Sequence, residues 1–419
     1  MKKLIQGIQI LQNEKIINNG YMIIEDDIIS EIGEGFCNEE DLSTIDLKNK
    51  KVLALPGLIN SHTHSGMAAL KGAGDDLPFE EWLFNRIVPL EDRLDEELIY
   101  LSTMISQMEM ARNGITTFVD MYMSLDSITR AVSDFGMRAY ICRGLQDQAM
   151  DDGQRLKKNI DAYEKHHGSS NGRISIGFGP HSPYLCSKNY LRKVSDVTSQ
   201  LNALMHIHLK ESQRESDQYT FRELAEIGLF NTKTIAAHCV YASPEDINVL
   251  QEFNVSVAHN PISNLKLANG IAPVDKMIEA GINVCLGTDS VSSNNSLDLF
   301  REMLVASLIH KGKTKDPQVI PALTSFKMAT VNGAKAFGHK NLGIIEKGKK
   351  ADIIFIDTEN INLIPFKNPI SNIVYSGRGS DVVATMVDGQ LIYHFGTYPT
   401  IDEQEIKKQF MDKFVRLYE

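Results

Sequence analysis

The chain has 419 residues, of which 42% are hydrophobic and 23% charged, and its formal net charge is −11. This balance is that of an ordinary globular protein. It disfavours a nucleic-acid partner, because no Lys/Arg-rich stretch offsets the acidity. The length suggests about two domains, unless one α/β barrel takes most of the chain.

The N-terminal region consists of short alternating stretches separated by turn signals, for example YMIIEDDIISEIGEG at 21–35. Such stretches predict β-strands. Residues 345–395 have the same character, and the tail from Asp402 has an amphipathic pattern that predicts a closing helix. Since chain termini often lie close together, we expect both ends to pair into one small β-sandwich. The expected domains are 1–56 and 345–419 for this unit, with the last helix, and 57–344 for the part between.

Eight short apolar runs lie between residues 52 and 290, and helical patterns separate them. One such pattern, 95–114, keeps three-or-four apolar spacing and ends at Gly114, and another, 243–253, has Ser243 as N-cap before Pro244. A further helix is expected over 217–228. The eight runs are 52–64, 114–121, 137–144, 174–182, 203–212, 234–240, 255–261 and 283–290.

Eight buried strands that alternate with helices predict the α/β fold class. The sheet is expected to be parallel and closed into a (β/α)8 TIM-like barrel, since parallel strands are buried on both faces and need crossover helices. An open doubly wound sheet is the alternative, and the absence of a Gly-x-Gly-x-x-Gly turn disfavours it.

Polar side chains collect where these apolar runs end, which in a (β/α)8 barrel is where active sites lie. Seven of the 12 histidines fall there, together with Glu211 and Asp289. The seven are His62, His64, His181, His206, His208, His238 and His259. The other five, which we expect in outer helices and loops, are His166, His167, His310, His339 and His394.

A metal site accounts for this clustering. Side chains alternate along a strand, so His62 and His64 point the same way and are able to grip one ion together. Three imidazoles and one carboxylate suit a zinc-like divalent ion with a water completing its shell. The predicted ligands are His62, His64, His208 and Asp289; iron, nickel and manganese also fit this set.

Each of the remaining polar residues at the strand ends has a predicted role. Glu211 lies three residues past His208 and is the predicted proton carrier beside the ion, whose bound water has a pKa lowered towards about 7. His206 is expected to be a hydrogen-bonded filler one layer down, His238 a ligand or a neighbouring base, and His259 structural. Metal-assisted hydrolysis is the predicted reaction class.

The five cysteines are odd in number and widely spaced, and no two form a Cys-x-x-Cys pair. They therefore indicate neither a disulfide framework nor a cysteine zinc site. The N-terminus is too polar after Leu11 for a signal peptide, and no 18 apolar residues run together. We expect a cytoplasmic protein that does not enter a membrane.

In combination these motifs resemble the amidohydrolase superfamily over nearly the whole chain. They are LPGLINSHTH (55–64), GITTFVDM (114–121), HIHLKES (206–212), AAHCV (236–240), LGTDS (286–290) and NLGIIEKGKKADIIFID (341–357). The resemblance implies a distorted barrel with a flanking β-sandwich from both ends. Binuclear members carry on the fourth strand a lysine that bridges two metals, whereas this chain has His181 in GFGPHSP. The resemblance therefore implies one metal ion per subunit.

Among mononuclear members the chain is most similar to the methylthioadenosine/S-adenosylhomocysteine deaminases, through GTDSVSSNNSLDLFREM (287–303) and NPISNLKLANGIAPV (260–274). By this resemblance Glu91 holds the ribose hydroxyls and His181 contacts the nucleoside. Arg143 and Arg155 meet the homocysteine carboxylate. From the residues alone, Glu91 and Arg155 would be solvated surface charges.

One departure is Ser290, where a glycine is usual, and it is expected to alter the loop after Asp289. The resemblance implies deamination of methylthioadenosine, S-adenosylhomocysteine and adenosine to inosyl products and ammonia. Glu211 would deliver a proton to ring N1, and Asp289 and His238 would orient the attacking water and take up its proton, so that Glu211 and Asp289 also contact the substrate.

Two alternatives remain open from the sequence. One is another amidohydrolase acting on a purine, pterin or triazine ring, such as a guanine deaminase or a chlorohydrolase. The other is a non-catalytic scaffold, against which the intact set of metal-type residues argues. The expected partner is a small nucleoside, and the family often self-associates, with Trp82 a candidate for a partner contact or a lid.

Overall fold

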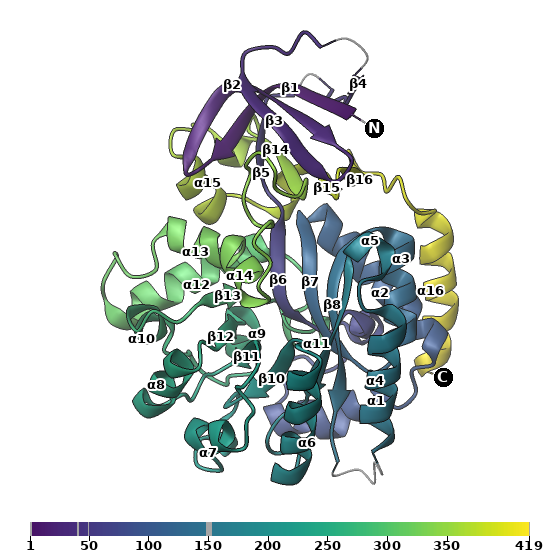
Figure 1. The fold of residues 1–419 in the computed structure, drawn as a ribbon, viewed down its shortest axis with the longest axis vertical. Helices are drawn as coiled ribbons and strands as arrows, with labels where there is room; N and C mark the ends of the chain where they lie inside the picture. The colour runs from purple at the N-terminus through teal and green to yellow at the C-terminus, as the bar shows by residue number, and fades with distance from the viewer. Residues whose placement is uncertain (1, 40–41, 49, 148–152, 419) are drawn as a thin grey trace.

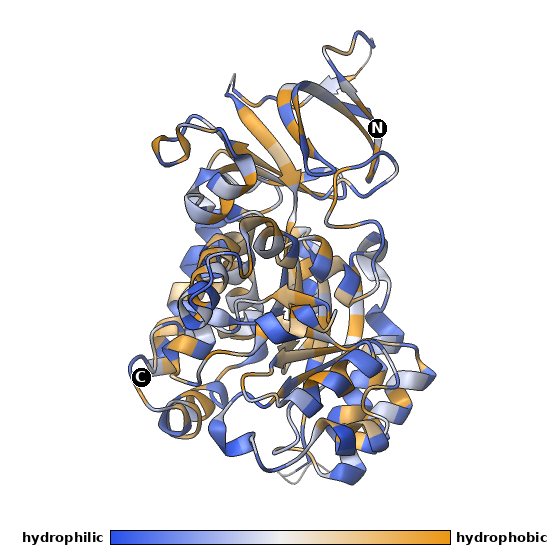
Figure 2. Cartoon of the chain, turned by 90° about the vertical axis from the view of Figure 1, so that its left-hand side faces the viewer, coloured by the Kyte–Doolittle hydropathy of each residue, from blue (hydrophilic) through white to orange (hydrophobic). Residues whose placement is uncertain are grey.

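The computed structural model describes residues 2–39, 42–48, 50–147 and 153–418. Its strands form two sheets of eight strands each. One belongs to the smaller unit of the protein, is called the smaller sheet below, and lies at one end of the molecule; the other forms a helix-covered barrel at the opposite end (Figure 1). Hydrophobic residues are concentrated along the strands, and hydrophilic residues alternate with them on the outer helices (Figure 2). Burial explains this distribution of hydropathy, because the barrel strands are buried on both faces while an outer helix needs only one apolar stripe.

The barrel is a parallel eight-stranded sheet with strands in chain order, as predicted. Its strands are β6 (Leu58–Thr63), β7 (Ile115–Tyr122), β8 (Arg138–Leu145), β9 (Ile174–Pro180), β10 (Met205–Leu209), β11 (Thr234–His238), β12 (Ser256–His259) and β13 (Val284–Leu286).

Helices connect these strands, and several of them begin at a capping side chain. Asp95 and Ser243 accept hydrogen bonds from backbone N–H groups in the first turns of α2 and α8, as expected for N-caps. The helices of the barrel are α1 (Val88–Glu91), α2 (Glu96–Arg112), α3 (Leu125–Phe135), α4 (Gln154–His166), α5 (Ser169–Gly172), α6 (Lys188–Gln200), α7 (Phe221–Glu226), α8 (Pro244–Glu252), α9 (Pro261–Lys266), α10 (Val274–Glu279), α11 (Val291–Asn294), α12 (Leu299–Thr314), α13 (Ala322–Met328) and α14 (Val331–Ala336). Short turns of other helix types are η1 (Ser65–Leu70), η2 (Glu81–Ile87) and η3 (Gln213–Glu215).

The barrel closes between its first and last strands at the end where the histidines lie. An isolated parallel bridge joins Thr63 to Asp289, and the Asp289 N–H donates to the His62 carbonyl at 2.9 Å. The closing bridge therefore brings the loop after β13 directly against the end of β6.

The predicted first strand, 52–64, is wrong as a single element. Residues Val52–Pro56 form β5 of the smaller sheet, and only β6 belongs to the barrel. The chain passes from one sheet to the other at Gly57, where a Cβ atom would collide with the side chain of Thr116. Glycine is required there by close approach to β7.

The smaller sheet combines both chain ends, as predicted, and encloses its own apolar core. Its path runs β16-β15-β14-β5-β1-β2-β3, with β4 paired to β1. The strands are β1 (Lys2–Gln12), β2 (Lys15–Glu25), β3 (Ile28–Glu34), β4 (Ser43–Thr44), β5, β14 (Ile353–Asp357), β15 (Val382–Val387) and β16 (Gln390–His394). Between and after them lie η4 (Ile361–Leu363), α15 (Pro369–Tyr375), η5 (Gly379–Asp381) and the closing helix α16 (Glu403–Tyr418), which packs against α2 on the side of the barrel (Figure 1).

A buried ion cluster joins the two sheets. Arg138, at the start of β8, is 1% exposed and donates to both carboxylate oxygens of Asp352 at 3.0 and 3.2 Å. It also contacts Asp388 in the turn between β15 and β16. A guanidinium in this position is stable only because both aspartates of the smaller sheet compensate its charge.

The cysteines are all free thiols, and four of them are buried. No helix in the described part of the chain combines the length and the apolar character that crossing a membrane requires.

Candidate active site

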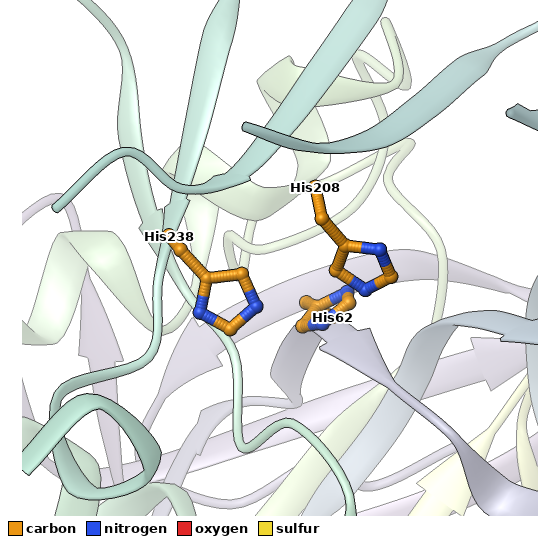
Figure 3. Close-up of side chains that lie close together, drawn as sticks. All are labelled: His62, His208 and His238. Atoms are coloured by element: carbon orange, nitrogen blue, oxygen red, sulfur yellow. The ribbon is translucent and has the colours of Figure 1, made fainter. Parts of the chain in front are cut away.

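Three barrel strands end with histidines that lie close together. Figure 3 shows the rings of His62, His208 and His238, which come from β6, β10 and β11. Each side chain is buried, with at most 4% exposed. The alternation of side chains along β6 and β10 turns these rings into the barrel mouth, as the sequence predicted.

Their ligand atoms converge. Within the residues that the structure describes, three overlapping groups have ligand atoms within 4.8 Å of one another: His62, His208 and His238; His62, His64 and Asp289; and Glu211, His238 and Asp289. None of these groups contains all four predicted ligands. His62 belongs to two groups and links His208 to the pair formed by His64 and Asp289.

The tautomers of two histidines are fixed by backbone carbonyls. Nδ1 of His64 lies 2.6 Å from the Met121 carbonyl oxygen, and Nδ1 of His208 lies 2.8 Å from that of His181. A carbonyl only accepts hydrogen bonds, so both Nδ1 atoms carry a proton when the rings are neutral. Both Nε2 atoms then present a lone pair, which is the form that binds a metal.

His62 lies deepest. Its Nδ1 is 2.7 Å from Nε2 of His206, which is the hydrogen-bonded interior histidine that the strand alternation predicted. Its Nε2 is buried without a hydrogen-bond partner. Burial lowers the pKa of His62 to about 4, so the ring stays neutral at pH 7. A buried, unpaired imidazole nitrogen is costly unless a metal or another group satisfies it, and this donor set therefore fits a divalent cation.

Asp289 supplies the carboxylate. Its Oδ1 lies 3.4 Å from Nε2 of His62 and 3.2 Å from Nε2 of His64, and its Oδ2 accepts hydrogen bonds from the hydroxyls of Ser263 (2.6 Å) and Ser293 (3.0 Å). Burial alone would lower the pKa of His64, but the hydrogen bond and charge of Asp289 raise it to about 9. The same field that favours a proton at this place would favour a metal cation.

The backbone is unusual at two of these positions. The φ angles of His238 and Asp289 are 71° and 61°, in the left-handed region that non-glycine residues rarely adopt. Such conformations cost about 1–3 kcal/mol each and persist where the surroundings over-determine them, which is typical of functional sites.

Glu211 follows β10 and is 7% exposed. Its Oε2 lies 3.8 Å from Nε2 of His238, and its Oε1 accepts a hydrogen bond from the Asn269 amide at 3.2 Å. Burial, followed by the negative charges of Asp289 and Glu215, raises the pKa of Glu211 well above its ordinary value. The side chain is therefore suited to carry a proton at neutral pH.

A cavity of about 410 Å³ opens above the cluster. All six predicted substrate contacts line it: Glu91, Arg143, Arg155, His181, Glu211 and Asp289. His64, His208 and His238 reach its surface, whereas His62 is not part of the lining. This size and mixture of polar and apolar walls suit a small organic ligand.

The polar residues of the cavity come from different elements. Glu91 ends α1, Arg143 is on β8, where it donates to the Met123 carbonyl, and Arg155 is in the first turn of α4. Burial raises the pKa of Glu91. From the residues alone, Glu91 and Arg155 were expected to be solvated surface charges. Both instead line the cavity. The apolar wall is built by Met67, Phe79, Trp82, Leu83, Phe84, Ile87, Val88, Met121 and Met123.

Three other expectations can be compared with the structure. Ser290 has an ordinary extended backbone (φ −75°, ψ 154°) and caps α11, so no glycine is needed there. His259 is buried away from the cavity, and its ring lies 5.4 Å from that of His310. The prediction that His310 lies in an outer position is wrong, because it is fully buried on the inner face of α12.

The sequence reasoning missed a set of supporting residues in the segment 260–269. Ser263 contacts Asp289, Asn264 contacts His238, and Asn269 contacts Glu211. The only signal was the motif NPISNLKLANG itself, which begins where the seventh barrel strand ends.

The sequence model of the amidohydrolase family matches residues 53–392. The 5-methylthioadenosine/S-adenosylhomocysteine deaminase of Thermotoga maritima is 48% identical over 365 residues, which cover 87% of this chain and 88% of that protein. The protein of the same name from Syntrophomonas wolfei is 42% identical over 418 residues and covers 97% of both chains.

A solved structure has the same fold as this chain. A zinc-bound adenosine deaminase from Xanthomonas campestris superimposes with a TM-score of 0.92 at 26% identity, covering 99% of this chain and 98% of that one. The family match spans most of the chain, and the relatives exceed 40% identity over almost their full length. The chain therefore belongs to the amidohydrolase family.

Proposed function

We propose that this protein is a metal-dependent aminohydrolase that deaminates 5'-methylthioadenosine and S-adenosylhomocysteine, and also accepts adenosine. The products are the corresponding inosyl compounds and ammonia. We call His62, His64, His208 and Asp289 the metal-type cluster. The observation that carries the proposal is one cavity whose lining includes three members of this cluster together with Glu91, Arg143 and Arg155. Relatives bearing this activity in their names match the chain over 87–97% of its length.

The metal ligands in this proposal are His62, His64, His208 and Asp289, and the ion is zinc. A zinc ion, when bound, would supply Lewis acidity, which lowers the pKa of a coordinated water to about 7. The orphaned Nε2 of His62 and the carbonyl-fixed tautomers of His64 and His208 support this assignment. The zinc named in the structure of the Xanthomonas campestris relative supports the choice of metal.

The protein side chains move the protons. Glu211 gives a proton to ring nitrogen N1 of adenine, which makes C6 more electrophilic. Asp289 and His238 orient the attacking water and accept its proton. The water oxygen forms a bond to C6, and the C6–N bond breaks as the amino group takes the proton that Asp289 or His238 removed from the water and leaves as ammonia. The hydroxyl group at C6 returns its remaining proton to Glu211 as the C6=O bond forms. Burial of Glu211 and His238 keeps bulk water from competing for these protons.

The rest of the cavity selects the nucleoside. A carboxylate such as Glu91 accepts hydrogen bonds from two ribose hydroxyls, and His181 contacts the nucleoside. Arg143 and Arg155 match the planar carboxylate of the homocysteine arm. The methionines and aromatic rings of the apolar wall suit a thioether. A free purine base or a triazine has neither a ribose nor a homocysteine arm, so it would use neither Glu91 nor the two arginines.

The test is a substrate panel on the purified, zinc-loaded protein. Methylthioadenosine, S-adenosylhomocysteine, adenosine, guanine and a chlorotriazine are each followed by absorbance change and ammonia or chloride release. We expect kcat/KM for the two thioether nucleosides to exceed that for guanine and the triazine by at least about 100-fold, because only nucleosides use the ribose and arm contacts. Faster turnover of guanine or the triazine would contradict the proposal. Full zinc occupancy without turnover of any compound would favour the scaffold alternative.

We place the reaction in the cytoplasm, since five free cysteines suit a reducing compartment.

A further inference from the structure

His238 has different neighbours at its two ring nitrogens. On one side, Nδ1 lies 2.8 Å from Oδ1 of Asn264. On the other side, Nε2 faces the metal-type cluster and lies 3.8 Å from Oε2 of Glu211. The ring is 1% exposed and Asn264 is 1% exposed, so neither nitrogen has free access to bulk water.

The contact with Asn264 decides where the ring proton lies. An amide oxygen only accepts hydrogen bonds, and a neutral imidazole carries one N–H. At 2.8 Å the bond forms only if Nδ1 carries that proton, which leaves a lone pair on Nε2. The amide nitrogen of Asn260, at 3.3 Å from Nδ1, is the longer and weaker neighbour.

Asn264 is held in place by its own backbone. Its N–H donates to the Asn260 carbonyl at 3.0 Å within α9, and its carbonyl accepts from the Asn269 N–H at 2.8 Å. Pro261 at the first turn of α9 sets the direction of the helix directly after β12. The amide therefore approaches His238 from a rigid element and not from a mobile loop.

The same segment supports the other two proton-handling groups. The Ser263 hydroxyl donates to Oδ2 of Asp289, and the Asn269 amide donates to Oε1 of Glu211. Side chains of 260–269 thus contact all three groups that handle protons in the proposed function, namely His238, Asp289 and Glu211. In His238 the contact is at the ring nitrogen that faces away from the metal-type cluster. In each carboxylate it is at one of the two oxygens.

We propose that Asn264 is a positioning residue that fixes His238 in the Nδ1–H tautomer and so keeps an unprotonated Nε2 toward the cavity. The catalytic consequence rests on the proposed function; the tautomer itself does not. In the opposite tautomer an N–H would point at the cluster, and His238 would be unable to accept a proton from the attacking water or to give a lone pair to a cation.

The direct test is the tautomer of His238 in the zinc-loaded, full-length protein. Long-range proton–nitrogen NMR on protein labelled with 15N-histidine separates pyrrole-type from pyridine-type or metal-bound nitrogens, and the variant His238→Gln identifies the resonances. We expect a pyrrole-type Nδ1 and an Nε2 without a proton. A proton on Nε2 in the wild type would overturn the proposal, whatever the substrate proves to be.

Two variants then link the tautomer to Asn264. Asn264→Asp keeps the acceptor and should keep the tautomer. Asn264→Leu removes it and should mix the tautomers and lower kcat by about 10- to 100-fold, the usual effect of losing such a supporting bond, with KM changed less than threefold. Asn332→Leu is the matched control. It removes a hydrogen bond from a side-chain amide to the Val284 carbonyl outside the cavity, and it should change neither the tautomer of His238 nor kcat.

The readouts separate three outcomes. A wild-type tautomer retained in Asn264→Leu would refute the role of Asn264, even if activity fell. If Asn264→Leu does not fold, the wild-type spectrum and the Asn264→Asp spectrum still decide the proposal. If no adenine nucleoside is deaminated, the proposed function fails while the NMR result stands on its own.

Discussion

Replacing Glu211 by glutamine tests the proton carrier with the smallest structural change. Glutamine has the same shape, and its amide oxygen is able to keep the hydrogen bond from Asn269. The ligand set proposed for the metal is untouched. What the variant loses is the ability to give and take a proton beside the substrate.

The size of the effect follows from the burial of Glu211. General acid–base catalysis contributes about 10²- to 10⁴-fold to rate, which equals roughly 2.7–5.4 kcal/mol in the activation free energy. Glu211 is 7% exposed, so water has little opportunity to replace it as a proton donor. We therefore expect the upper half of this range, a loss of about 10³-fold or more in kcat, with KM within about threefold of the wild type.

The assay measures kcat and KM for methylthioadenosine by the absorbance change on deamination, with zinc content determined on the same samples. The matched control is Glu302→Gln, since Glu302 is also buried, lies outside the cavity, and has a pKa that burial raises to about 8, so that it is already mostly neutral at pH 7. The control should keep kcat within about twofold. A Glu211→Gln enzyme with full turnover and full zinc content would falsify the proton-carrier role.

Four further predictions follow from other parts of the molecule. Removing the metal with a chelator should abolish activity and lower the melting temperature, and zinc at 100 times its Kd should restore about 2.7 kcal/mol of stability; an unchanged melting curve would contradict a bound metal. Arg155→Leu should lower kcat/KM for S-adenosylhomocysteine by about 10- to 100-fold and leave methylthioadenosine within threefold, and equal losses for both would argue against a carboxylate contact. Burial raises the pKa of Glu302 from its ordinary 4.5 to about 8, so between these values the folded state keeps a proton that the unfolded state releases. The free energy of unfolding of the wild type should therefore fall by up to about 1.4 kcal/mol per pH unit between pH 5 and pH 8. Urea titration of the wild type and of Glu302→Gln, which should lack this fall, measures the difference. Arg138→Met leaves the Asp352 carboxylate buried without its cationic partner, and Asp388 with Lys350 alone; it should cost about 3–5 kcal/mol, and a loss below about 1 kcal/mol would show that water reaches this cluster.

The sequence was most informative where local geometry alone decides the outcome. Alternation along a strand is a property of the backbone, so the common direction of His62 and His64, and the position of His206 one layer below His208, followed from spacing. The barrel followed because eight apolar runs with intervening helices have few other solutions. The smaller sheet was predictable as a class, since residues 1–51 and 345–395 share strand patterns and lack long helical patterns.

What the sequence did not reveal depends on contacts between distant segments. Residues 52–64 look like one strand because β5 and β6 are both fully buried, and the change at Gly57 is set by the close approach of Thr116. His310 is buried because other elements cover α12, which periodicity does not report. Asn264 supports a histidine 26 residues earlier in the chain, and only the folded barrel brings the two together.

The bridge between Thr63 and Asp289 makes the chemistry of this protein depend on closure of the barrel. Two of the proposed ligands come from the opening strand, and another comes from the loop after the eighth strand, more than 220 residues later. A nascent or truncated chain that lacks the final strand has the imidazoles but not the carboxylate beside them. The proposed cation would therefore bind only once the first and last strands have met, and it would then hold these two edges of the barrel together.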